Sequence, residues 1–550
     1  MQNKTEFSSN SNSILSIQFF VCLVILVAAC IIQFHGFYHY LDVLFFDESE
    51  YLYKGIIMPK KIYTDWGPSY NLWYRFIFIF TKNPITTYYV NYVLLNTLIP
   101  ILLFIFLVRN SINKWLSLLL SILLLTNSLL YANFTQVSNF CIVIMLLSFI
   151  IISYVKADEN KIIVAIAGAY ICMYARQEFL LIIALLFLLW CFVIIKQKKI
   201  RFSFAYISLI VIIVVLYAIF GLVSFNAQGM DRSLFAFGQH FYVNYCVMIG
   251  KFLTLDEFLN LKLFGESKTM FQCLLYDPIL FMKHVGMNML NYTYSLFKII
   301  EGYILPSYLF KYLGKLKHIL FVGMIAFFVY HYFKKKSYKS VLNSFKQISI
   351  TNCIYLIFFI CSYFSIFFIF PEKHYIIIQF VWWILLFAYA LNPLIEKYLN
   401  KNIYYTFFIL LLVLMPKANQ IAFRHNVVTD YNKQPNLKVI NFLNKNNKDK
   451  KEKIIFSTEK GITTYVAPNY RELFLESDSL KSYTTNKINA AQFLKNNNVE
   501  IIHMTENMQK LIGDTTVLDC DKFIHHPEEV GYYKQVIDTS MKTYLLIRKQ

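Results

Sequence analysis

The sequence predicts a polytopic α-helical membrane protein that ends in a small α/β domain. Its 550 residues are 57% hydrophobic and only 15% charged, whereas a soluble domain carries about 25% charged residues. Apolar runs of about 17–25 residues, long enough to cross a bilayer, recur up to residue 417, and the remaining residues are polar. Phe and Tyr, with 53 and 41 residues, fit this class because aromatic side chains gather at membrane interfaces.

The apolar runs give about eleven candidate spans. No clear small-residue cleavage site follows the first of them, so we interpret it as an uncleaved signal anchor. Residues 285–305 are a further candidate, either as a span or as an interfacial helix. The expected spans are 14–33, 88–108, 115–131, 138–155, 161–175, 177–195, 202–223, 316–333, 347–370, 375–391 and 401–417.

Basic loops set the expected orientation, because loops rich in Lys and Arg stay on the cytoplasmic side. The N-terminus is then inside and, with an odd number of spans, the C-terminus is outside. Two outer segments are long, 34–87 and 224–315, and we expect short amphipathic helices on the outer leaflet there, such as 252–263. The densest basic clusters in the short loops are 109–114, 196–201 and 334–339.

The chain changes character near Ala418, so we expect a membrane domain at 1–417 and a soluble α/β domain at 418–550. Helices are expected at Asn436–Leu443 and Ala490–Asn496. Alternating and β-branched patterns predict strands. The expected strands are Lys453–Ser457, Val499–His503, Tyr533–Ile537 and Thr543–Ile547.

Charge and cysteine content exclude some classes of function. The net charge of +20 does not indicate nucleic-acid binding, because the basic residues sit in short loops where they set topology. The ten cysteines are scattered and form no CxxC pair, so neither a disulfide framework nor a zinc site is supported. We find no Gly-rich phosphate loop.

Asp47 and Glu48 are the most informative residues. They follow the first span by about a dozen positions, and carboxylates at a membrane face are costly unless they have a function. A sugar transfer needs a base for the incoming hydroxyl, and a carboxylate suits this role. The alternative is an acidic helix start or a solvated loop, since acids favour the first turn of a helix.

Further polar residues occur at the expected outer face. Asp65 and Trp66 precede a Gly-Pro turn, where Trp66 is a sugar-stacking candidate or a membrane-belt anchor. Arg176 and Glu178 lie in a tight turn between two spans. Arg176 is either a ligand of a lipid phosphate or an ion-pair partner of Glu178 or Asp47.

Three more candidates come from later segments. His240 lies in the long loop 224–315 and titrates near neutral pH, although a lone histidine is more often structural. Lys373 and His374 open a span on the outer side, where they would neutralise a phosphate leaving group; the alternative for Lys373 is snorkelling to the headgroups. The candidates meet on one membrane face from four distant segments, which carries more weight than any one residue.

These motifs resemble the multi-spanning glycosyltransferases of the GT-C superfamily, near the protein mannosyltransferase and aminoarabinose transferase type. The Phe-Asp-Glu-Ser-Glu-Tyr stretch at 46–51 stands where that superfamily carries its Asp-Glu pair. Trp-Gly-Pro-Ser-Tyr at 66–70 is similar to its Pro-x-Tyr stretch, and Ala-Arg-Gln-Glu-Phe at 175–179 to its Arg-Pro-Glu turn, with Gln in place of Pro. Loop patterns at 237–240, and at 277–281 with Asn288, are similar to those of bacterial members.

The resemblance covers roughly residues 10–420. It implies an inverting transfer from a polyprenyl-phosphate sugar to a glycan, lipid or protein acceptor, on the extracytoplasmic face of a bacterial inner or plasma membrane. Asp47 would be the base or the acceptor-orienting carboxylate, with Arg176 and Lys373 on the donor phosphate. Many bacterial members have an Arg-Tyr pair where this chain has Lys-His-Tyr at 373–375, which leaves the phosphate ligand open. No metal ligands are assigned, and dependence on a divalent metal is open.

Two other functions are weighed. Polysaccharide polymerases and ligases of the O-antigen type also span the membrane many times, but they place their decisive long loop late in the chain. Transporters need polar residues or broken helices at mid-membrane, and most spans here lack charge at their centres.

Overall fold

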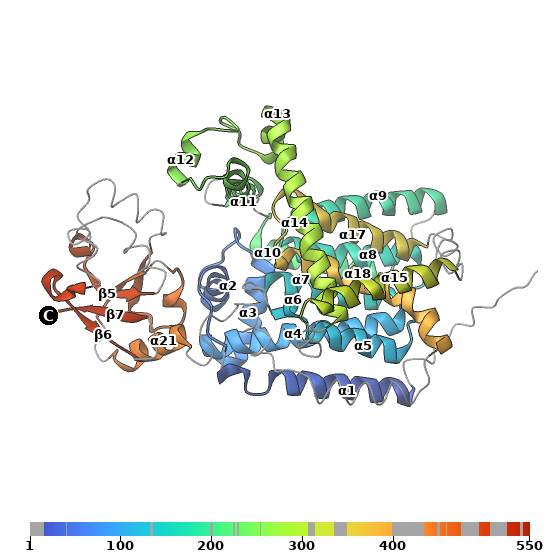
Figure 1. Ribbon diagram of the computed structural model, residues 1–550, viewed down its shortest axis with the longest axis horizontal. Coiled ribbons are helices and arrows are strands. Elements are labelled where there is room, and N and C mark those ends of the chain that lie inside the picture. Colours follow the sequence, from blue (N-terminus) through green and yellow to red (C-terminus); the bar gives the residue numbers. More distant parts are fainter. Residues whose placement is uncertain are drawn as a thin grey trace, which may run out of the picture.

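A bundle of long helices carries a small sheet domain at one end (Figure 1). The computed structural model describes residues 16–39, 41–131, 136–198, 202–223, 226–227, 230–253, 255–305, 314–334, 349–398, 434–447, 451–457, 459–474, 494–505, 525–538 and 543–549. The boundary expected near residue 418, the expected span 401–417 and most of the expected helix at 490–496 lie outside these ranges.

The described helices follow the apolar runs. Capping side chains fix several starts: Ser16 accepts from the Phe19 backbone N–H at 3.3 Å, and Asn83 accepts from the Thr86 N–H at 3.0 Å. The helices of the bundle are α1 (Ile17–Phe34), α4 (Pro84–Arg109), α5 (Lys114–Leu125), α6 (Ser128–Tyr131), α7 (Val137–Ile152), α8 (Asp158–Met173), α9 (Phe179–Gln197), α10 (Phe204–Phe220), α15 (Leu316–Lys334), α17 (Ile350–Phe368) and α18 (Lys373–Tyr398).

Five described stretches are long and apolar enough to cross a membrane. They are Ile17–His39, Pro84–Arg109, Phe179–Gln197, Ile350–Phe368 and Lys373–Asn392. Three shorter apolar helices, α5, α7 and α10, run beside them. Nine of the first ten expected spans correspond to one helix each, and the span 115–131 corresponds to α5 and α6. The apolar runs thus identified the bundle, while the total of about eleven spans stays a prediction.

Four helices outside the expected spans were not predicted from the sequence. α2 (Asp47–Ile57) and α3 (Pro68–Thr81) form a helical hairpin in the first long loop. α11 (Arg232–Ile249) and α13 (Met270–Tyr276) belong to the second. The amphipathic helix expected at 252–263 is shorter, α12 (Leu255–Asn260). The candidate at 285–305 covers all but the first seven residues of α14 (Pro278–Ile304).

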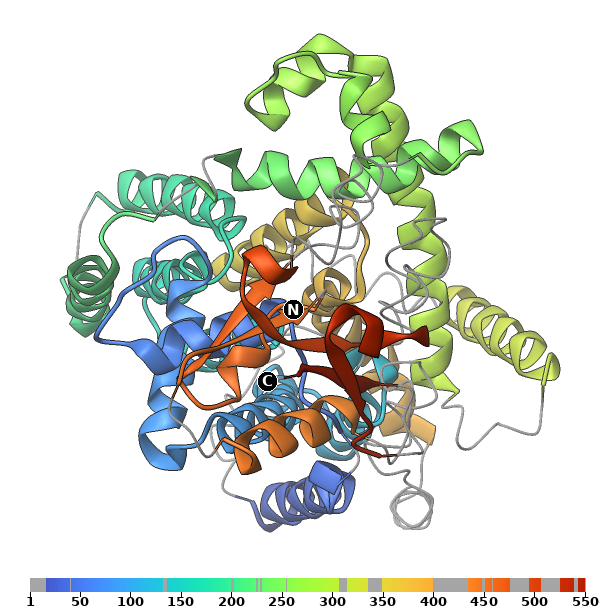
Figure 2. The same cartoon turned by 90° about the vertical axis from the view of Figure 1, so that its left-hand side faces the viewer.

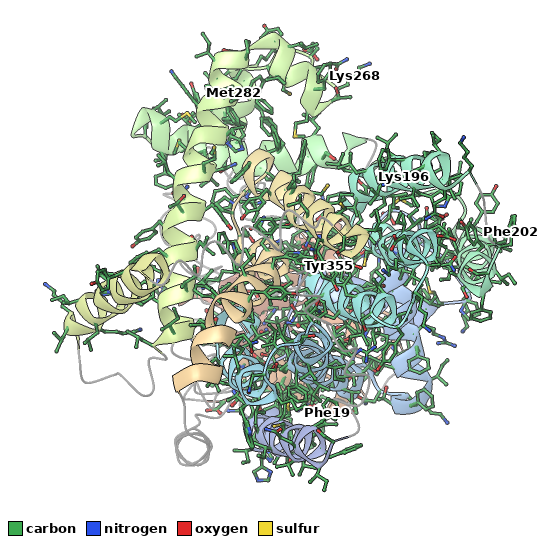
Figure 3. All side chains as sticks on the ribbon, turned by 90° about the vertical axis from the view of Figure 1, so that its right-hand side faces the viewer. Phe19, Lys196, Phe202, Lys268, Met282 and Tyr355 are labelled. Carbon is green, nitrogen blue, oxygen red and sulfur yellow. The ribbon has the colours of Figure 1, made fainter. Side chains whose placement is uncertain are left out.

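Basic helix ends gather at the end of the bundle that is opposite the sheet. Lys114, at the start of α5, donates from Nζ to Ser16 Oγ at 2.7 Å, and Arg109, at the end of α4, donates from Nε to Ser153 Oγ at 2.9 Å. Lys196 of α9 lies at this end as well (Figure 3). The expected orientation, with these basic residues in the cytoplasm, stays a prediction.

The C-terminal domain is a five-stranded mixed sheet with the strand order β4-β3-β5-β7-β6. Strands β3 (Lys453–Ser457), β5 (Val499–Met504), β6 (Tyr532–Gln535) and β7 (Tyr544–Arg548) confirm the expected strands, and β4 (Tyr470–Phe474) was not expected. β3 is parallel to β4 and β5, and β7 is antiparallel to β5 and β6. The helix α21 (Pro435–Lys445) is the first described element of this domain. The domain faces the viewer in Figure 2.

Candidate functional site

A cavity of about 610 Å³ opens where the α2 end of the bundle meets the helices of the second long loop. Its wall mixes charged, aromatic and aliphatic side chains from segments that are far apart in sequence. Six of the nine predicted site residues line it: Asp47, Trp66, Arg176, Glu178, His240 and His374. The other lining residues are Tyr51, Val137, Gln177, Leu180, Leu181, Ser233, Phe235, Ala236, Gln239, Met270, Phe364, Ser365, Phe368, Ile369, Glu372 and Tyr375.

Asp47 is the first residue of α2 and an exposed carboxylate on the cavity wall. The free N–H groups of a helix N-terminus favour negative charge, so this position suits an ionised carboxylate. The preceding residue, Phe46, has φ 58° and ψ −132°, a left-handed conformation that is costly for a residue with a side chain. The backbone is therefore strained directly before Asp47.

Glu48 does not line the cavity and is buried, with 1% of its surface exposed. Its Oε1 accepts from the Tyr70 hydroxyl at 2.6 Å and from the Tyr74 hydroxyl, and its Oε2 accepts from the Gln136 backbone N–H at 2.9 Å. Burial raises the pKa of Glu48 to about 7, against the lowering effect of these hydrogen bonds. The two adjacent acids thus occupy opposite environments, and only Asp47 can meet a molecule in the cavity.

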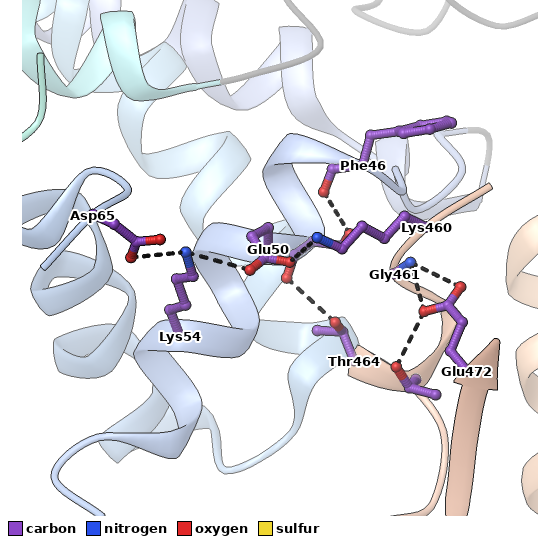
Figure 4. Close-up of polar contacts among 10 residues, drawn as sticks. Phe46, Glu50, Lys54, Asp65, Lys460, Gly461, Thr464 and Glu472 are labelled. Carbon is purple, nitrogen blue, oxygen red and sulfur yellow. Dashed lines mark hydrogen bonds and ion pairs between the residues drawn. The ribbon is translucent and has the colours of Figure 1, made fainter. Parts of the chain in front are cut away.

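Of the neighbours Asp65 and Trp66, only Trp66 lines the cavity. Asp65 stays outside the cavity and pairs with Lys54, whose Nζ is 3.3 Å from Asp65 Oδ1 and 3.3 Å from Glu50 Oε1 (Figure 4). Trp66 reaches the cavity wall beside Tyr51, with the ring centroids 6.5 Å apart. The two ring planes are tilted by 35°, and each ring has an apolar face of the kind on which sugars stack.

Arg176 is buried, and three contacts hold its side chain in place. Its Nε donates to Glu178 Oε1, its guanidinium donates to Ser138 Oγ, and its Cζ lies 4.3 Å from the centre of the Tyr375 ring. Burial opposes its charge, but Glu178 raises the pKa of Arg176 above its ordinary value. Of the alternatives weighed for this residue, the ion pair with Glu178 is present, and the guanidinium remains a fixed cation on the cavity wall.

His240 and His374 face the cavity from α11 and α18. The His240 ring stacks on Phe370, with centroids 4.8 Å apart and planes 6° from parallel. Burial lowers the pKa of His240, although Glu372 opposes this shift. His374 Nδ1 lies 3.0 Å from Glu372 Oε2, and this contact lowers the pKa of Glu372. His240 is therefore neutral at neutral pH, and Glu372 is ionised.

Lys373 is exposed and does not line the cavity, although it begins α18 immediately before His374. The site gains instead residues that the sequence did not single out, chiefly Glu372 and Tyr375. Both residues lie within the Pro-Glu-Lys-His-Tyr stretch at 371–375. The sequence therefore pointed to the correct segment but not to these two side chains.

A buried polar cluster holds the segment that carries Glu372 and His374. His284 Nε2 lies 3.1 Å from the carbonyl oxygen of Ile369, and Asn288 Nδ2 donates to the same oxygen at 3.1 Å. Asn244 of α11 donates to Asn288 Oδ1 at 2.8 Å. Burial lowers the pKa of His284 to about 4. His284 and Asn288, with Asn244, thus fix the loop between α17 and α18.

Among the described residues, no group of three or more His, Cys, Asp or Glu side chains is placed to hold a metal ion. Of the cavity's three carboxylates, Glu178 pairs with Arg176 and Glu372 pairs with His374. Asp47 is the one carboxylate among these three that lies exposed at the start of a helix.

No family model matches the chain, and no curated protein matches it. A similar solved structure is the crystal structure of the Archaeoglobus fulgidus oligosaccharyltransferase in complex with zinc and sulfate. It aligns with a TM-score of 0.43 and 11% sequence identity, over 97% of this chain and 73% of that chain. The function is therefore inferred from the chain's own residues and their arrangement.

Proposed function

We propose that this chain is a membrane glycosyltransferase. It moves a sugar from a polyprenyl-phosphate donor to a glycan, lipid or protein acceptor on the extracytoplasmic face of a bacterial inner or plasma membrane. The observation that carries the proposal is the position of Asp47, an exposed carboxylate on the wall of a cavity that also holds Arg176, His240 and His374.

Asp47 is the base or acceptor-orienting carboxylate in this mechanism. It accepts a hydrogen bond from the acceptor hydroxyl and removes its proton as the hydroxyl oxygen attacks the anomeric carbon of the donor. The bond from that carbon to the phosphate oxygen breaks on the opposite face, so configuration inverts. Glu48 serves a different purpose, since its hydrogen bonds to Tyr70 and Tyr74 anchor the first turn of α2.

The phosphate of the donor has one fixed cation to meet. Arg176 presents its guanidinium to the cavity while Glu178 and Ser138 hold it in place. Charge-assisted hydrogen bonds from arginine to phosphate are among the stronger polar contacts. Because Glu178 already balances part of this charge, His374 is the second candidate ligand; Lys373 is outside the cavity and is the weakest of the predicted ligands.

The cavity wall also suits a lipid-linked donor. Leu180 and Leu181 come from α9, and Phe364 and Phe368 come from α17, both of which are candidate membrane spans. Leu180 and Phe364 are exposed on the flanks of their helices. A polyprenyl chain in the bilayer can lie along these apolar side chains while its phosphate reaches Arg176.

Transfer from defined polyprenyl-phosphate sugars by the purified full-length protein tests the proposal. Asp47→Asn removes the base and should lower the rate about 10²–10⁴-fold. The matched control is Asp158→Asn, because Asp158 also begins a helix but lies in α8, away from the cavity; it should stay within about twofold of the wild type.

Equal activity of the Asp47→Asn variant and the wild type, at equal expression and melting temperature, would overturn the role of Asp47. A wild-type protein that turns over none of a panel of donor sugars would overturn the function itself.

A further inference from the structure

The C-terminal domain contacts the bundle through the segment that leads to Asp47. We call residues 41–50 the Asp47 loop and residues 459–465 the docking loop. Asp42 accepts the backbone N–H groups of Asn436 and Leu437 at 2.8 and 2.9 Å, so it satisfies the first turn of α21. The hydroxyl of Tyr465 donates to the Leu44 carbonyl oxygen at 2.9 Å.

Three further contacts involve residues that neighbour Asp47 in the chain. The Phe46 backbone N–H donates to the Lys460 carbonyl oxygen at 2.6 Å. Lys460 Nζ lies 3.2 Å from Glu50 Oε2 (Figure 4). Thr464 Oγ1 donates to the Ser49 carbonyl oxygen at 3.3 Å. The docking loop thus contacts the residue before Asp47 and two residues shortly after it.

Phe46 is where this contact matters most. Its φ of 58° with ψ −132° belongs to a region that residues with a side chain rarely occupy. Its side chain gives little compensation, because 49% of its surface is exposed. The hydrogen bond to Lys460 is on the backbone of Phe46, so the C-terminal domain directly supports the strained conformation.

Gly461 makes the close approach of the two loops sterically feasible. Its φ is 114°, and a Cβ added there would lie 1.8 Å from Ser49 Oγ and 2.7 Å from Ser49 Cβ. Both oxygens of the Glu472 carboxylate accept its N–H, at 3.0 and 2.9 Å, and one accepts the Thr463 hydroxyl at 3.3 Å. Only glycine fits this point of contact, and β4 holds it in place through Glu472.

We infer that the docking loop is a positioning element for the catalytic site. It holds Phe46 in its left-handed conformation and thereby directs the first residue of α2, Asp47, toward the cavity. The inference rests on the proposed function for its consequence in catalysis, but the mechanical coupling between the two loops is independent of the reaction. Gly461, Lys460 and Thr464 act through the backbone of the Asp47 loop and are positioning residues.

Hydrogen exchange on the purified full-length protein tests the coupling without any substrate. Gly461→Ala should push the docking loop away from Ser49 and release the Phe46 amide, so exchange in peptides covering 43–50 should accelerate roughly tenfold. The matched control is Gly531→Ala. Gly531 has φ 83° in the same domain, but an added Cβ there meets no atom within 4 Å, so exchange in 43–50 should not change.

A double substitution separates positioning from simple loss of structure. Gly461→Ala should lower kcat about tenfold or more with little change in KM, because a misdirected base affects the chemical step. Adding Phe46→Gly should restore most of the rate, since glycine adopts the required φ without support. Exchange in β3 and β5 should match the wild type in all variants. Gly461→Ala with Ser49→Gly removes the clash with the Ser49 side chain but leaves residue 461 at a φ of 114°, so it should restore only part of the rate.

Unchanged exchange in 43–50 of the Gly461→Ala variant would overturn the coupling. Faster exchange with unchanged kcat would overturn the positioning role, as would a loss of kcat that neither Phe46→Gly nor Ser49→Gly repairs. If the wild type transfers no sugar, the proposed function fails, and the exchange comparison alone still decides whether the docking loop holds the Asp47 loop.

Discussion

Adjacent carboxylates in α2 occupy environments that give them opposite properties. Asp47 is exposed at a helix N-terminus, whereas Glu48 is enclosed by Tyr70, Tyr74, Asn91 and the backbone of Gln136. The enclosure explains why burial raises the pKa of Glu48 to about 7. At the scale of single residues, the acid pair therefore divides into an exposed carboxylate, Asp47, for which we propose the chemical role, and a buried carboxylate, Glu48, which is held by hydrogen bonds.

Glu48 predicts a specific pH dependence of stability. Its pKa in the folded protein is about 7, above its ordinary value of 4.5, so the folded state binds this proton more tightly than the unfolded state. The contribution of Glu48 to stability is therefore full below about pH 4.5 and is lost as the pH rises through 7. The melting temperature should fall between pH 5 and pH 8, and less steeply in Glu48→Gln. Parallel curves for the two proteins would contradict this.

Arg176 and Lys373 allow a matched test of the proposed binding of a donor phosphate. Arg176→Gln removes a guanidinium from the cavity wall and should raise the donor KM about 10–100-fold, since hydrogen bonds to charged groups contribute about 1.5–3 kcal/mol. Lys373→Gln should have a much smaller effect because Lys373 lies outside the cavity. Initial rates at varied donor and acceptor concentrations measure both, and a larger effect on the acceptor KM would contradict the assignment.

At the scale of elements, the helices of the second long loop perform two tasks. α11 and α14 hold the loop between α17 and α18 through Asn244, His284 and Asn288. α12 and α13 instead expose apolar side chains, including Leu259, Phe271, Leu275 and Tyr276. An exposed apolar surface of this kind beside a membrane bundle is typical of elements that lie on the lipid surface.

Labelled variants in lipid nanodiscs test whether α13 lies on the membrane. A fluorophore on Phe271→Cys, in a background without the native cysteines, should be quenched by lipids that carry a spin label near the headgroup, because Phe271 is 66% exposed. The control is Lys268→Cys, which places the same label on an exposed polar position nearby (Figure 3). Equal quenching at both positions would argue against contact of α13 with the lipid.

At the scale of the whole molecule, the sequence predicted local features well and contacts between distant segments poorly. Apolar runs located the bundle helices, and alternation located β3, β5, β6 and β7. The helix α3 was missed although Pro68 at its first position is a usual helix start. β4 was missed because its burial does not alternate.

Contacts between distant segments left no local signal. Asn436 and Asp42, which join the two parts of the molecule, are 394 positions apart. The burial of Glu48 likewise depends on Tyr70, Tyr74 and Gln136 from other segments. The sequence could therefore identify the acid pair, but only the packing of these segments separates the environments of Asp47 and Glu48.

The last prediction concerns the orientation of the whole chain. Lys196 lies at the end of the bundle opposite the C-terminal sheet (Figure 3). The end of α4, with Arg109, and the start of α5, with Lys114, lie at that end as well (Figure 1). Basic loops stay in the cytoplasm, so the sheet, the docking loop and the cavity should lie outside. The native Cys520, an obvious probe, lies outside the described residues, so an exposed described position is the better choice.

With the ten native cysteines replaced, a membrane-impermeant thiol reagent should label Glu528→Cys on cells with an intact inner membrane. It should label Lys196→Cys only after that membrane is opened, because Lys196 is exposed at the opposite end. The reverse pattern would place Asp47 and its cavity in the cytoplasm. A donor presented on the outer leaflet would then never reach Asp47, and the reaction would have to use a substrate from the cytoplasmic side.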